Sequence, residues 1–182
     1  MKLITDRLVL RAIQKDDATA IFNYRSDALA NKYQGWIPQN INDVNDFIDK
    51  VSKAINIPGT WFQFLIICSQ NDEIIGDIGI HFLDAESKQV EIGCTLCKFH
   101  QKKGLATEAL RRIITYLFED LNKQKVIASI DPRNSASIEL VTRLGFKKEA
   151  HFRENLFINN EWVDDAVYAI LNEEWITSFK RD

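Results

Sequence analysis

Apolar residues recur along the chain with two different periods, and the period changes from one segment to the next. A period near 3.6 indicates an amphipathic helix, and alternation at every second residue indicates a strand. Helices are predicted over residues 16–26, 42–55, 104–118 and 134–144. Strands are predicted over residues 7–13, 61–69, 73–83, 88–96, 125–130, 146–157 and 162–171. The order β-α-α-β-β-β-α-β-α-β-β is typical of a mixed sheet with helices on both faces.

Turn-forming residues separate these segments where the pattern changes. Gln70-Asn71-Asp72 and Asp84-Ala85-Glu86 divide the three central strands, which predicts an antiparallel meander. Asn134 is suited to cap the fourth helix, Gly145 is suited to end it, and Asn159-Asn160 is suited to a closing hairpin. Because no linker, internal repeat or low-complexity tract interrupts the pattern, we expect one domain over residues 1–182.

Composition and charge narrow the class of protein. With 182 residues, 46% hydrophobic and 27% charged, the chain has an ordinary globular composition, which excludes global disorder. The longest apolar run, residues 64–68, is far shorter than the ~18 residues of a membrane-spanning helix. Charge interrupts the N-terminus too early for a secretory signal, so a cytoplasmic location is expected. A net charge of -3 and a pI near 5.7 make nucleic acid an unfavourable partner.

Three cysteines, Cys68, Cys94 and Cys97, form an odd set, and we expect them to be reduced. Cys94-x-x-Cys97 lacks the second ligand pair that a zinc site requires. In a strand, positions three apart also point to opposite faces. No metal is therefore expected.

The most informative segment is a strand over residues 91–96 that leads through a basic, glycine-containing loop into the helix beginning at Gly104. The first N–H groups of a helix lack intrahelical partners and are available to an anion such as phosphate. Neither GxxxxGK[ST] nor GxGxxG is present. Gly104 could also serve only as the tight turn that begins the helix.

Gln101-x-x-Gly104-x-Ala106 resembles the [Q/R]xxGx[G/A] acetyl-CoA motif of the GNAT N-acetyltransferase superfamily. Further segments are similar to its ribosomal-protein N-terminal acetyltransferase (Rim-like) branch, in the same order along nearly the whole chain. The resemblance implies an α/β fold with a central mixed, mostly antiparallel sheet of six to seven strands, helices on both faces and a splayed strand pair at a cofactor cleft. The similar segments are Thr5-Asp6-Arg7-Leu8-Val9-Leu10-Arg11, Ile75-Gly76-Asp77-Ile78-Gly79, Glu91-Ile92-Gly93, Asp131-Pro132-Arg133-Asn134-Ser135-Ala136-Ser137-Ile138, Leu144-Gly145-Phe146 and Trp162-x-Asp164-Asp165 to Glu174-Trp175.

The resemblance also implies acetyl-CoA as cosubstrate. Backbone N–H groups of residues 102–106 would hold its pyrophosphate, with charge from Lys102 and Lys103, and the strand ending at Leu96 would splay from residues 126–130 to admit the pantetheine arm. The residues implied to bind the cofactor are Cys94, Thr95, Leu96, Gln101, Lys102, Lys103, Gly104, Leu105, Ala106, Thr107, Asn134 and Ser137.

Asn134 and Ser137 match the NxxS pattern of the branch, in which the asparagine contacts the pantetheine arm and the serine lies near the sulfur. Asn134 could instead only cap its helix, and Ser137 could be only a first-turn hydroxyl. Many superfamily members have a tyrosine acid four residues further on. Val141 stands there in this chain, so such an acid is excluded at this position.

Acetyl transfer requires a neutral amine nitrogen, so a base must take up a proton. Glu91 is the best candidate, because Val90, Ile92 and Cys94 share one face of the predicted strand and leave Glu91 on the other. If that face lines a cleft, the partly desolvated carboxylate has a raised pKa suited to a base. If it meets solvent, Glu91 is a surface charge. Asp77 in the neighbouring strand is a weaker alternative.

The acceptor side is the least determined. In the branch, it is lined by the loop between the first two helices and by the closing hairpin, which correspond to Tyr33, Gln34, Gly35 and Trp36 and to the 152–154 region. Asp77 is a further candidate for substrate binding. His81 and His100 are lone histidines with no recognisable partner in the sequence, which favours structural or peripheral roles.

These residues predict an N-acetyltransferase that passes the acetyl group of acetyl-CoA directly to a primary amine in a ternary complex. The acceptor could be a protein N-terminus, an amino acid or another small amine, and a homodimer is compatible with the sequence. The alternative is a noncatalytic acyl-CoA-binding or sensing module. The presence of Glu91 together with Ser137 favours the enzyme, since a pure binder needs neither.

Overall fold

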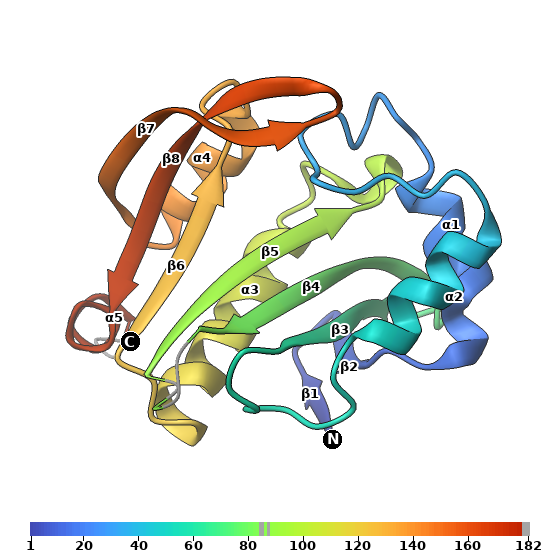
Figure 1. The fold of residues 1–182 in the computed structure, drawn as a ribbon. Helices are drawn as coiled ribbons and strands as arrows, with labels where there is room; N and C mark the ends of the chain where they lie inside the picture. Colours follow the sequence, from blue (N-terminus) through green and yellow to red (C-terminus); the bar gives the residue numbers. More distant parts are fainter. Residues whose placement is uncertain (84–85, 87, 180–182) are drawn as a thin grey trace.

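The computed structural model describes residues 1–83, 86 and 88–179, and its centre is an eight-stranded sheet (Figure 1). The strand order is β1-β2-β3-β4-β5-β6-β8-β7, and every neighbouring pair is antiparallel except β5 and β6. The strands and helices are β1 Lys2–Ile4, β2 Leu8–Ala12, α1 Ala18–Arg25, α2 Ile41–Lys50, β3 Trp61–Cys68, β4 Ile74–Phe82, β5 Gln89–Leu96, α3 Leu105–Thr115, β6 Lys125–Ile130, α4 Ser135–Arg143, β7 Lys147–Ile158, β8 Glu161–Leu171 and α5 Asn172–Phe179.

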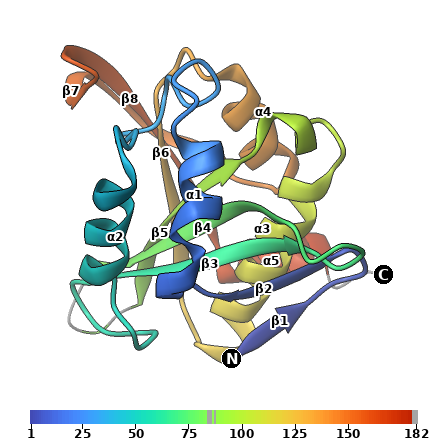
Figure 2. The same ribbon diagram turned by 90° about the vertical axis from the view of Figure 1, so that its right-hand side faces the viewer.

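Two hydrophobic cores lie on opposite faces of the sheet. Strand β3 alternates between them: Phe64 and Ile66 pack in the core shared with α3, α4 and α5, whereas Leu65 and Ile67 pack against α1 and α2. Figures 1 and 2 show α1 and α2 on one side of the sheet and α3 on the other. The predicted mixed sheet with helices on both faces is confirmed. No described helix is both long enough and apolar enough to cross a membrane.

Strands β5 and β6 separate soon after they begin. Their parallel pairing covers only Gln89, Val90 and Glu91 of β5, opposite residues 125–127 of β6. Beyond Glu91 the two strands diverge, as Figure 1 shows, although β5 stays paired with β4 as far as Leu96. The β6-facing edge of residues 92–96 is therefore not used by β6, and the predicted splayed pair is confirmed.

The structure corrects the predicted number and length of several elements. Strand β1 and helix α5 were not predicted, and β1 brings the sheet to eight strands rather than six to seven. A strand of three residues, with Leu3 buried and Ile4 exposed, is too short to produce a recognisable period. Helix α2 ends at Lys50 and not at residue 55, because Val51 is extended and the Ser52 N–H donates to the Trp61 carbonyl.

The predicted hairpin is confirmed, and its turn residues have the expected conformation. Asn159 and Asn160 both have positive φ, at 50° and 64°, which suits a two-residue turn between right-twisted strands. The predicted turn at Asp84-Ala85-Glu86 lies partly outside the described residues.

Candidate functional site

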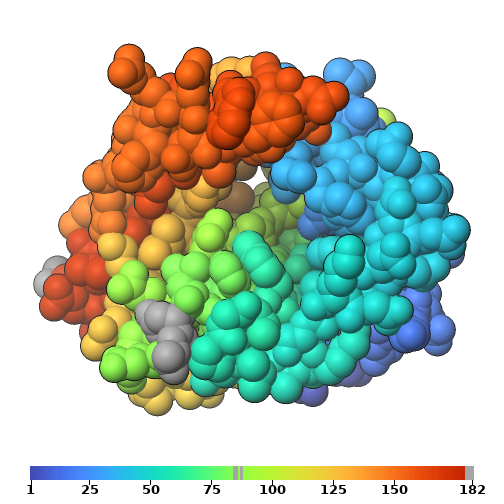
Figure 3. Space-filling view, in the orientation of Figure 1, coloured from blue at the N-terminus to red at the C-terminus, as the bar shows by residue number. Residues whose placement is uncertain are grey.

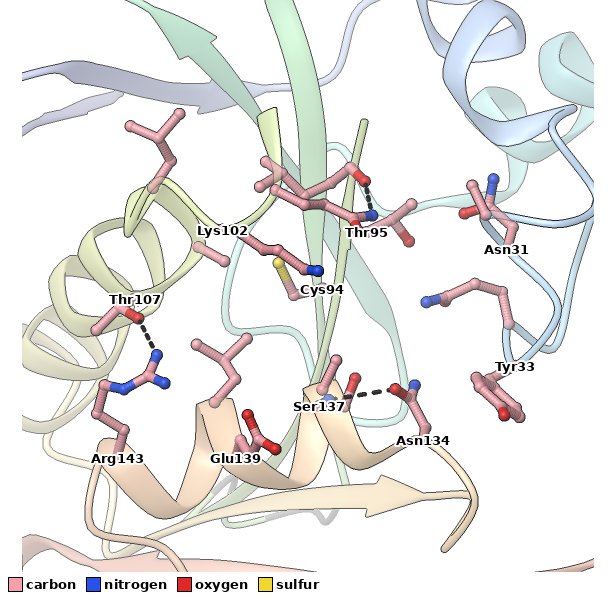
Figure 4. A pocket seen from close by; sticks show the side chains of 18 of the residues that line it. Asn31, Tyr33, Cys94, Thr95, Lys102, Thr107, Asn134, Ser137, Glu139 and Arg143 are labelled. Atoms are coloured by element: carbon pink, nitrogen blue, oxygen red, sulfur yellow. Dashed lines mark hydrogen bonds between the residues drawn. The ribbon is translucent and has the colours of Figure 1, made fainter. Parts of the chain in front are cut away.

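A cavity of about 390 Å³, here called the α3 cavity, lies where β5 runs into the loop before α3 (Figure 4). It is lined by the end of β5, this loop, the first turn of α3, one side of α4 and residues 30–34. Of the twelve residues implied to bind a cofactor, Lys103 does not line it. The other eleven do: Cys94, Thr95, Leu96, Gln101, Lys102, Gly104, Leu105, Ala106, Thr107, Asn134 and Ser137.

The loop before α3 is held in shape by left-handed residues and by contacts with the N-terminal strands. Lys102 and Gly104 have φ of 61° and 78°, and the left-handed region favours glycine. The Gln101 side-chain amide donates to the Leu96 carbonyl at 2.9 Å, which closes the loop on itself. Arg7 donates to the Lys103 carbonyl at 3.0 Å. These contacts turn the side of the loop that carries Lys102 toward the cavity.

Arg7 and Glu108 form a clamp that sequence reasoning missed. Glu108 lies in the first turn of α3 and pairs with Arg7 at 2.6 Å, and it also accepts the Thr5 hydroxyl at 2.6 Å. Partial burial opposes ionisation of Glu108, but the hydrogen bonds from Thr5 and Arg7 outweigh it and lower its pKa. The segment containing Thr5 and Arg7 was noted only for its resemblance. Its position shows that it fastens the start of α3.

The α3 cavity favours an anion. The Glu108 N–H makes the first intrahelical bond to the Gly104 carbonyl, so the N–H groups before it have no partner within the helix. Three cations, Lys32, Lys102 and Arg143, line the cavity against one acid, Glu139, and Arg143 donates to the Thr107 hydroxyl at 3.3 Å. Lys32 and Arg143 were not predicted, because they lie far from the loop in sequence.

A second cavity of about 400 Å³, here called the hairpin cavity, lies on the far side of the splay under the tip of the β7–β8 hairpin. Figure 3 shows a hollow between this hairpin and the segment after α1. The two cavities share Tyr33, Gln34, Cys94, Asn134, Ser137 and Leu140 as lining residues. They therefore meet at the gap that the separation of β5 from β6 leaves in the sheet.

The hairpin tip is tied to the segment after α1 across the top of the hairpin cavity. The Asn159 side-chain amide donates to the Lys32 carbonyl at 2.9 Å. The Arg133 guanidinium lies 5.9 Å from the centre of the Tyr33 ring and pairs with Glu161 at 2.8 Å. The lining from the hairpin is residues 156–158, further along β7 than the predicted 152–154 region.

Glu91 lines the hairpin cavity and is half-buried. Burial raises its pKa above the ordinary value, the charge of Asp165 adds to the effect, and His81 opposes it. His81 lies opposite Glu91 on β4 and stacks on Trp61, with ring centres 4.7 Å apart. The structure therefore gives His81 two neighbours, Glu91 and Trp61, that the sequence did not reveal.

Two glycines of β4 shape this region of the sheet. A Cβ on Gly76 would collide with the Thr95 carbonyl oxygen, so β4 and β5 could not approach as they do. A Cβ on Gly79 would lie 2.9 Å from the Gln63 amide oxygen and 3.1 Å from the Trp61 ring. Gly79 thus leaves room for Trp61, which forms a wall of the hairpin cavity.

Asn134 and Ser137 lie at the start of α4, at the junction of the two cavities. The Asn134 side-chain oxygen accepts the Ser137 N–H at 3.2 Å, as drawn in Figure 4, so the capping interpretation of Asn134 is confirmed. Cys94 lines both cavities and packs against the core that the sheet shares with α3. Burial raises the pKa of its thiol to about 12. Cys97 packs on the α1–α2 side, so the two thiols do face opposite ways.

Asp77 does not reach either cavity, which corrects its assignment as a substrate-binding residue and alternative base. It is 2% exposed and lies between the sheet and α1. Its carboxylate accepts hydrogen bonds from Tyr24 at 2.5 Å, from Arg25 at 2.8 and 2.5 Å, and from Gln63 at 2.5 Å. All four donors come from the protein, so Asp77 has a structural role.

Trp36 also does not line either cavity, whereas Tyr33 lines both. The Trp36 ring stacks on Phe47 of α2 at 4.7 Å and lies 5.3 Å from the Arg25 guanidinium. These contacts place Trp36 in the packing of α1 on α2, and only Tyr33 remains of the predicted aromatic pair.

Residues 7–147 match the family model described as acetyltransferase (GNAT) domain. The N-acetyltransferase p20 of Bacillus licheniformis, itself named as uncharacterized, is 32% identical over 95% of this chain and 97% of that protein. The [Ribosomal protein uS5]-alanine N-acetyltransferase of Escherichia coli is 26% identical over 96% of this chain and 93% of its own length. The crystal structure of a GNAT-family acetyltransferase from Bacillus anthracis superimposes with a TM-score of 0.84 at 28% identity, covering 95% of this chain and 99% of the other.

Proposed function

Because the chain belongs to the acetyltransferase (GNAT) family and is an acetyl-CoA-dependent N-acetyltransferase, we propose that it acetylates a primary amine by direct attack within a ternary complex. The observation that supports this proposal is the junction of the α3 and hairpin cavities at the β5–β6 splay. A cofactor in one cavity and an amine in the other would meet there.

The α3 cavity fits acetyl-CoA. Lys32, Lys102, Arg143 and the N–H groups at the start of α3 offer positive charge to phosphates. The β6-facing edge of residues 92–96 offers backbone groups to an extended amide-containing arm. Lys102 would contact the phosphates directly, whereas Lys103 would add only to the surrounding field. When bound, acetyl-CoA supplies a thioester carbonyl carbon that an amine can attack.

Glu91 takes up the proton in this proposal. The acceptor enters as an ammonium ion, and Glu91 removes one N–H proton, directly or through water, which frees the nitrogen lone pair. The lone pair forms the new N–C bond, and the C–S bond breaks with its electron pair leaving on sulfur. The second proton that the nitrogen loses on becoming an amide passes, directly or through water, to this sulfur, which leaves as a thiol. The raised pKa of Glu91 brings it closer to neutrality, which makes it a better base than an ordinary surface carboxylate.

Ser137 and Cys94 have different positions in this scheme. Ser137 lines both cavities and would lie near the departing sulfur, where its hydroxyl can donate to the thiolate. Cys94 also lines both cavities, but with a pKa of about 12 its thiol stays protonated at neutral pH and is a poor nucleophile. This supports direct transfer without an acetyl-cysteine.

The acceptor belongs to the class of primary amines. One relative is named for the alanine N-terminus of a ribosomal protein, which makes a protein N-terminus the first acceptor to test. Amino acids and other small amines follow, because the hairpin cavity of about 400 Å³ has room for a small molecule. The cytoplasmic location and the homodimer stay predictions.

The test is thiol release from acetyl-CoA in the presence of N-terminal peptides, amino acids and small amines. We expect acceptor-stimulated release and intersecting initial-rate lines when both substrates are varied, because both must be bound together. Parallel lines together with an acetylated enzyme in mass spectra would contradict direct attack. Tight acetyl-CoA binding without release by any acceptor would instead indicate the noncatalytic module.

A further inference from the structure

One acidic side chain of the hairpin cavity, Glu91, has no ion-pair partner among the described residues. Among the described residues, its lining contains two acids, Glu91 and Asp131, and no lysine, arginine or histidine. Asp131 is already paired with Arg133 at 2.6 Å. Glu91 forms no ion pair within the described part of the chain, although His81 lies opposite it on β4, so a ligand of this cavity gains by bringing positive charge.

A third carboxylate, that of Asp165, lies directly behind the wall of this cavity. Ser129 of β6 is a lining residue, and its hydroxyl donates to the Asp165 carboxylate at 2.7 Å. Asp165 is 5% exposed, and its other oxygen accepts the Asn155 side-chain amide at 3.2 Å. Both donors are neutral, and no cation of the described residues lies within ion-pair distance. Among the described residues, Asp165 is thus a buried carboxylate held by neutral donors.

The Ser129 hydroxyl is oriented by this contact. Its only hydrogen is used in the bond to Asp165, so the oxygen is left as an acceptor toward the cavity. An ammonium group is the donor that suits this oxygen, because the Asp165 charge behind it adds attraction.

Glu91 and Ser129 lie on the same face of the sheet but at different positions along the strand direction. Glu91 is the partner of Ile127 in β6, and Ser129 is two residues beyond Ile127. Two residues along a strand correspond to about 6.6 Å. The Asp165 charge also contributes to the raised pKa of Glu91. The cavity therefore offers two separate places for positive charge, within the length of a small molecule.

We propose that Ser129, backed by Asp165, binds a second positive charge of the acceptor, so that the enzyme selects amines with a further cationic group a few bonds from the reacting nitrogen. This rests on the proposed function, with the reacting nitrogen at Glu91. The rings of Tyr33, Trp61 and Phe157 line the same cavity and suit an alkyl chain that ends in a cation. A small diamine and a peptide with a basic residue next to its N-terminus present this same chemistry.

The test compares acceptors that differ in the charge at their far end. Diaminobutane carries a second ammonium, pentylamine a methyl group of similar size, and aminopentanoate a carboxylate. We expect kcat/KM to be on the order of tenfold higher for diaminobutane than for pentylamine, and lowest for aminopentanoate. A peptide pair, Ala-Lys-Ala and Ala-norleucine-Ala, distinguishes the source of the charge. Equal values in both pairs would overturn the proposal.

Asp165→Asn removes the charge and keeps the shape. It should raise the KM for diaminobutane about tenfold and the KM for pentylamine far less, which a merely structural role would not do. Asp164→Asn is the matched control, because Asp164 is the neighbouring carboxylate and pairs with His151 on the hairpin. It should leave the ratio of the two amines unchanged. An equal loss for both amines in Asp165→Asn would contradict the assignment.

A binding measurement separates this inference from the proposed function. Calorimetry with the CoA-bound protein should show tighter binding of diaminobutane than of pentylamine, and Ser129→Ala should abolish the difference even if Asp165→Asn fails to fold. A binding preference without any acetylation would support the inference and contradict the proposed function. Acetylation of both amines with no binding preference would support the proposed function and contradict the inference.

Discussion

The two cavities that meet at the β5–β6 splay have similar volumes, about 390 and about 400 Å³, but opposite charge. Lysine and arginine side chains outnumber acids three to one in the lining of the α3 cavity, whereas the described lining of the hairpin cavity has two acids and no cation. Under the proposed function, this difference suits a polyanionic cofactor on one side of the gap and an ammonium acceptor on the other.

The two cavities also differ in how the chain builds them. Most of the α3 cavity comes from one continuous segment, residues 94–107, in which a strand, a loop and a helix start follow one another, although the cations Lys32 and Arg143 lie outside it. The hairpin cavity takes Tyr33, Trp61, Glu91, Ser129 and Phe157 from five distant parts of the chain. Variants can therefore alter one cavity while the other stays intact.

The largest expected effect tests which carboxylates belong to the hairpin cavity. Asp77→Asn would leave the buried Arg25 charge without its ionic partner, and we expect the free energy of unfolding to fall by about 3 kcal/mol or more. Burial, with the Asp77 charge adding to it, holds the pKa of Tyr24 well above its ordinary value, so Tyr24 stays a donor in wild type. Denaturant unfolding measures the loss. A variant with unchanged stability but no acetylation activity would show that Asp77 is a functional residue of the site.

Next in size is the loss of the base. Glu91→Gln should lower kcat on the order of a hundredfold while leaving acetyl-CoA affinity unchanged, because only the hairpin cavity is altered. Activity should recover partly at high pH, where more of the amine is already neutral. In the wild type, Glu91 must be ionised, so the rate should fall as the pH drops through its raised pKa. The variant should lack this acidic limb.

Ser137→Ala is the comparison variant for Glu91→Gln, because it alters the junction without removing the base. It should lower kcat less than Glu91→Gln does, since a thiolate with a pKa near ~8.5 leaves without full protonation. An inactive Ser137→Ala beside a fully active Glu91→Gln would show that the base has been assigned wrongly.

A smaller effect is expected from Gly104→Asp, which alters only the α3 cavity. The added carboxylate would lie where phosphate is expected to approach, and acetyl-CoA binding should weaken at least tenfold, or about 1.4 kcal/mol. Gly104→Asn is the matched control: it imposes the same strain at a φ of 78° without the charge. Calorimetry that gives equal affinity for the two variants would assign the effect to the backbone alone.

The smallest expected effect separates the two loop lysines. Lys102→Ala should weaken acetyl-CoA binding a few-fold, and the loss should shrink as salt is added, because an exposed charge is screened. Lys103→Ala should have little effect, since Lys103 is outside the cavity lining. Titrations at low and high salt measure both. A greater loss for Lys103→Ala would mean that the loop turns differently around the cofactor.

Local sequence was sufficient to predict the features whose interactions lie close along the chain. The capping of α4 by Asn134 spans three residues, and the left-handed turn at Gly104 reflects a conformation that glycine adopts readily. The strand-loop-helix anion site was recognisable for the same reason. Two short elements were not predicted. Strand β1 has only three residues, and α5 follows β8 without a break, so no turn residue marks where this helix begins.

Tertiary structure decided which of the polar residues face a cavity. Asp77 and Glu91 are both carboxylates of central strands, but the docking of α1 places Arg25 on Asp77 and leaves Glu91 open to the hairpin cavity. The Ser129–Asp165 bond joins residues 36 positions apart, and the Asn159–Lys32 bond joins residues 127 apart. Such pairings depend on strand register and on packing between elements, and these are set by the burial of the whole core rather than by neighbouring residues.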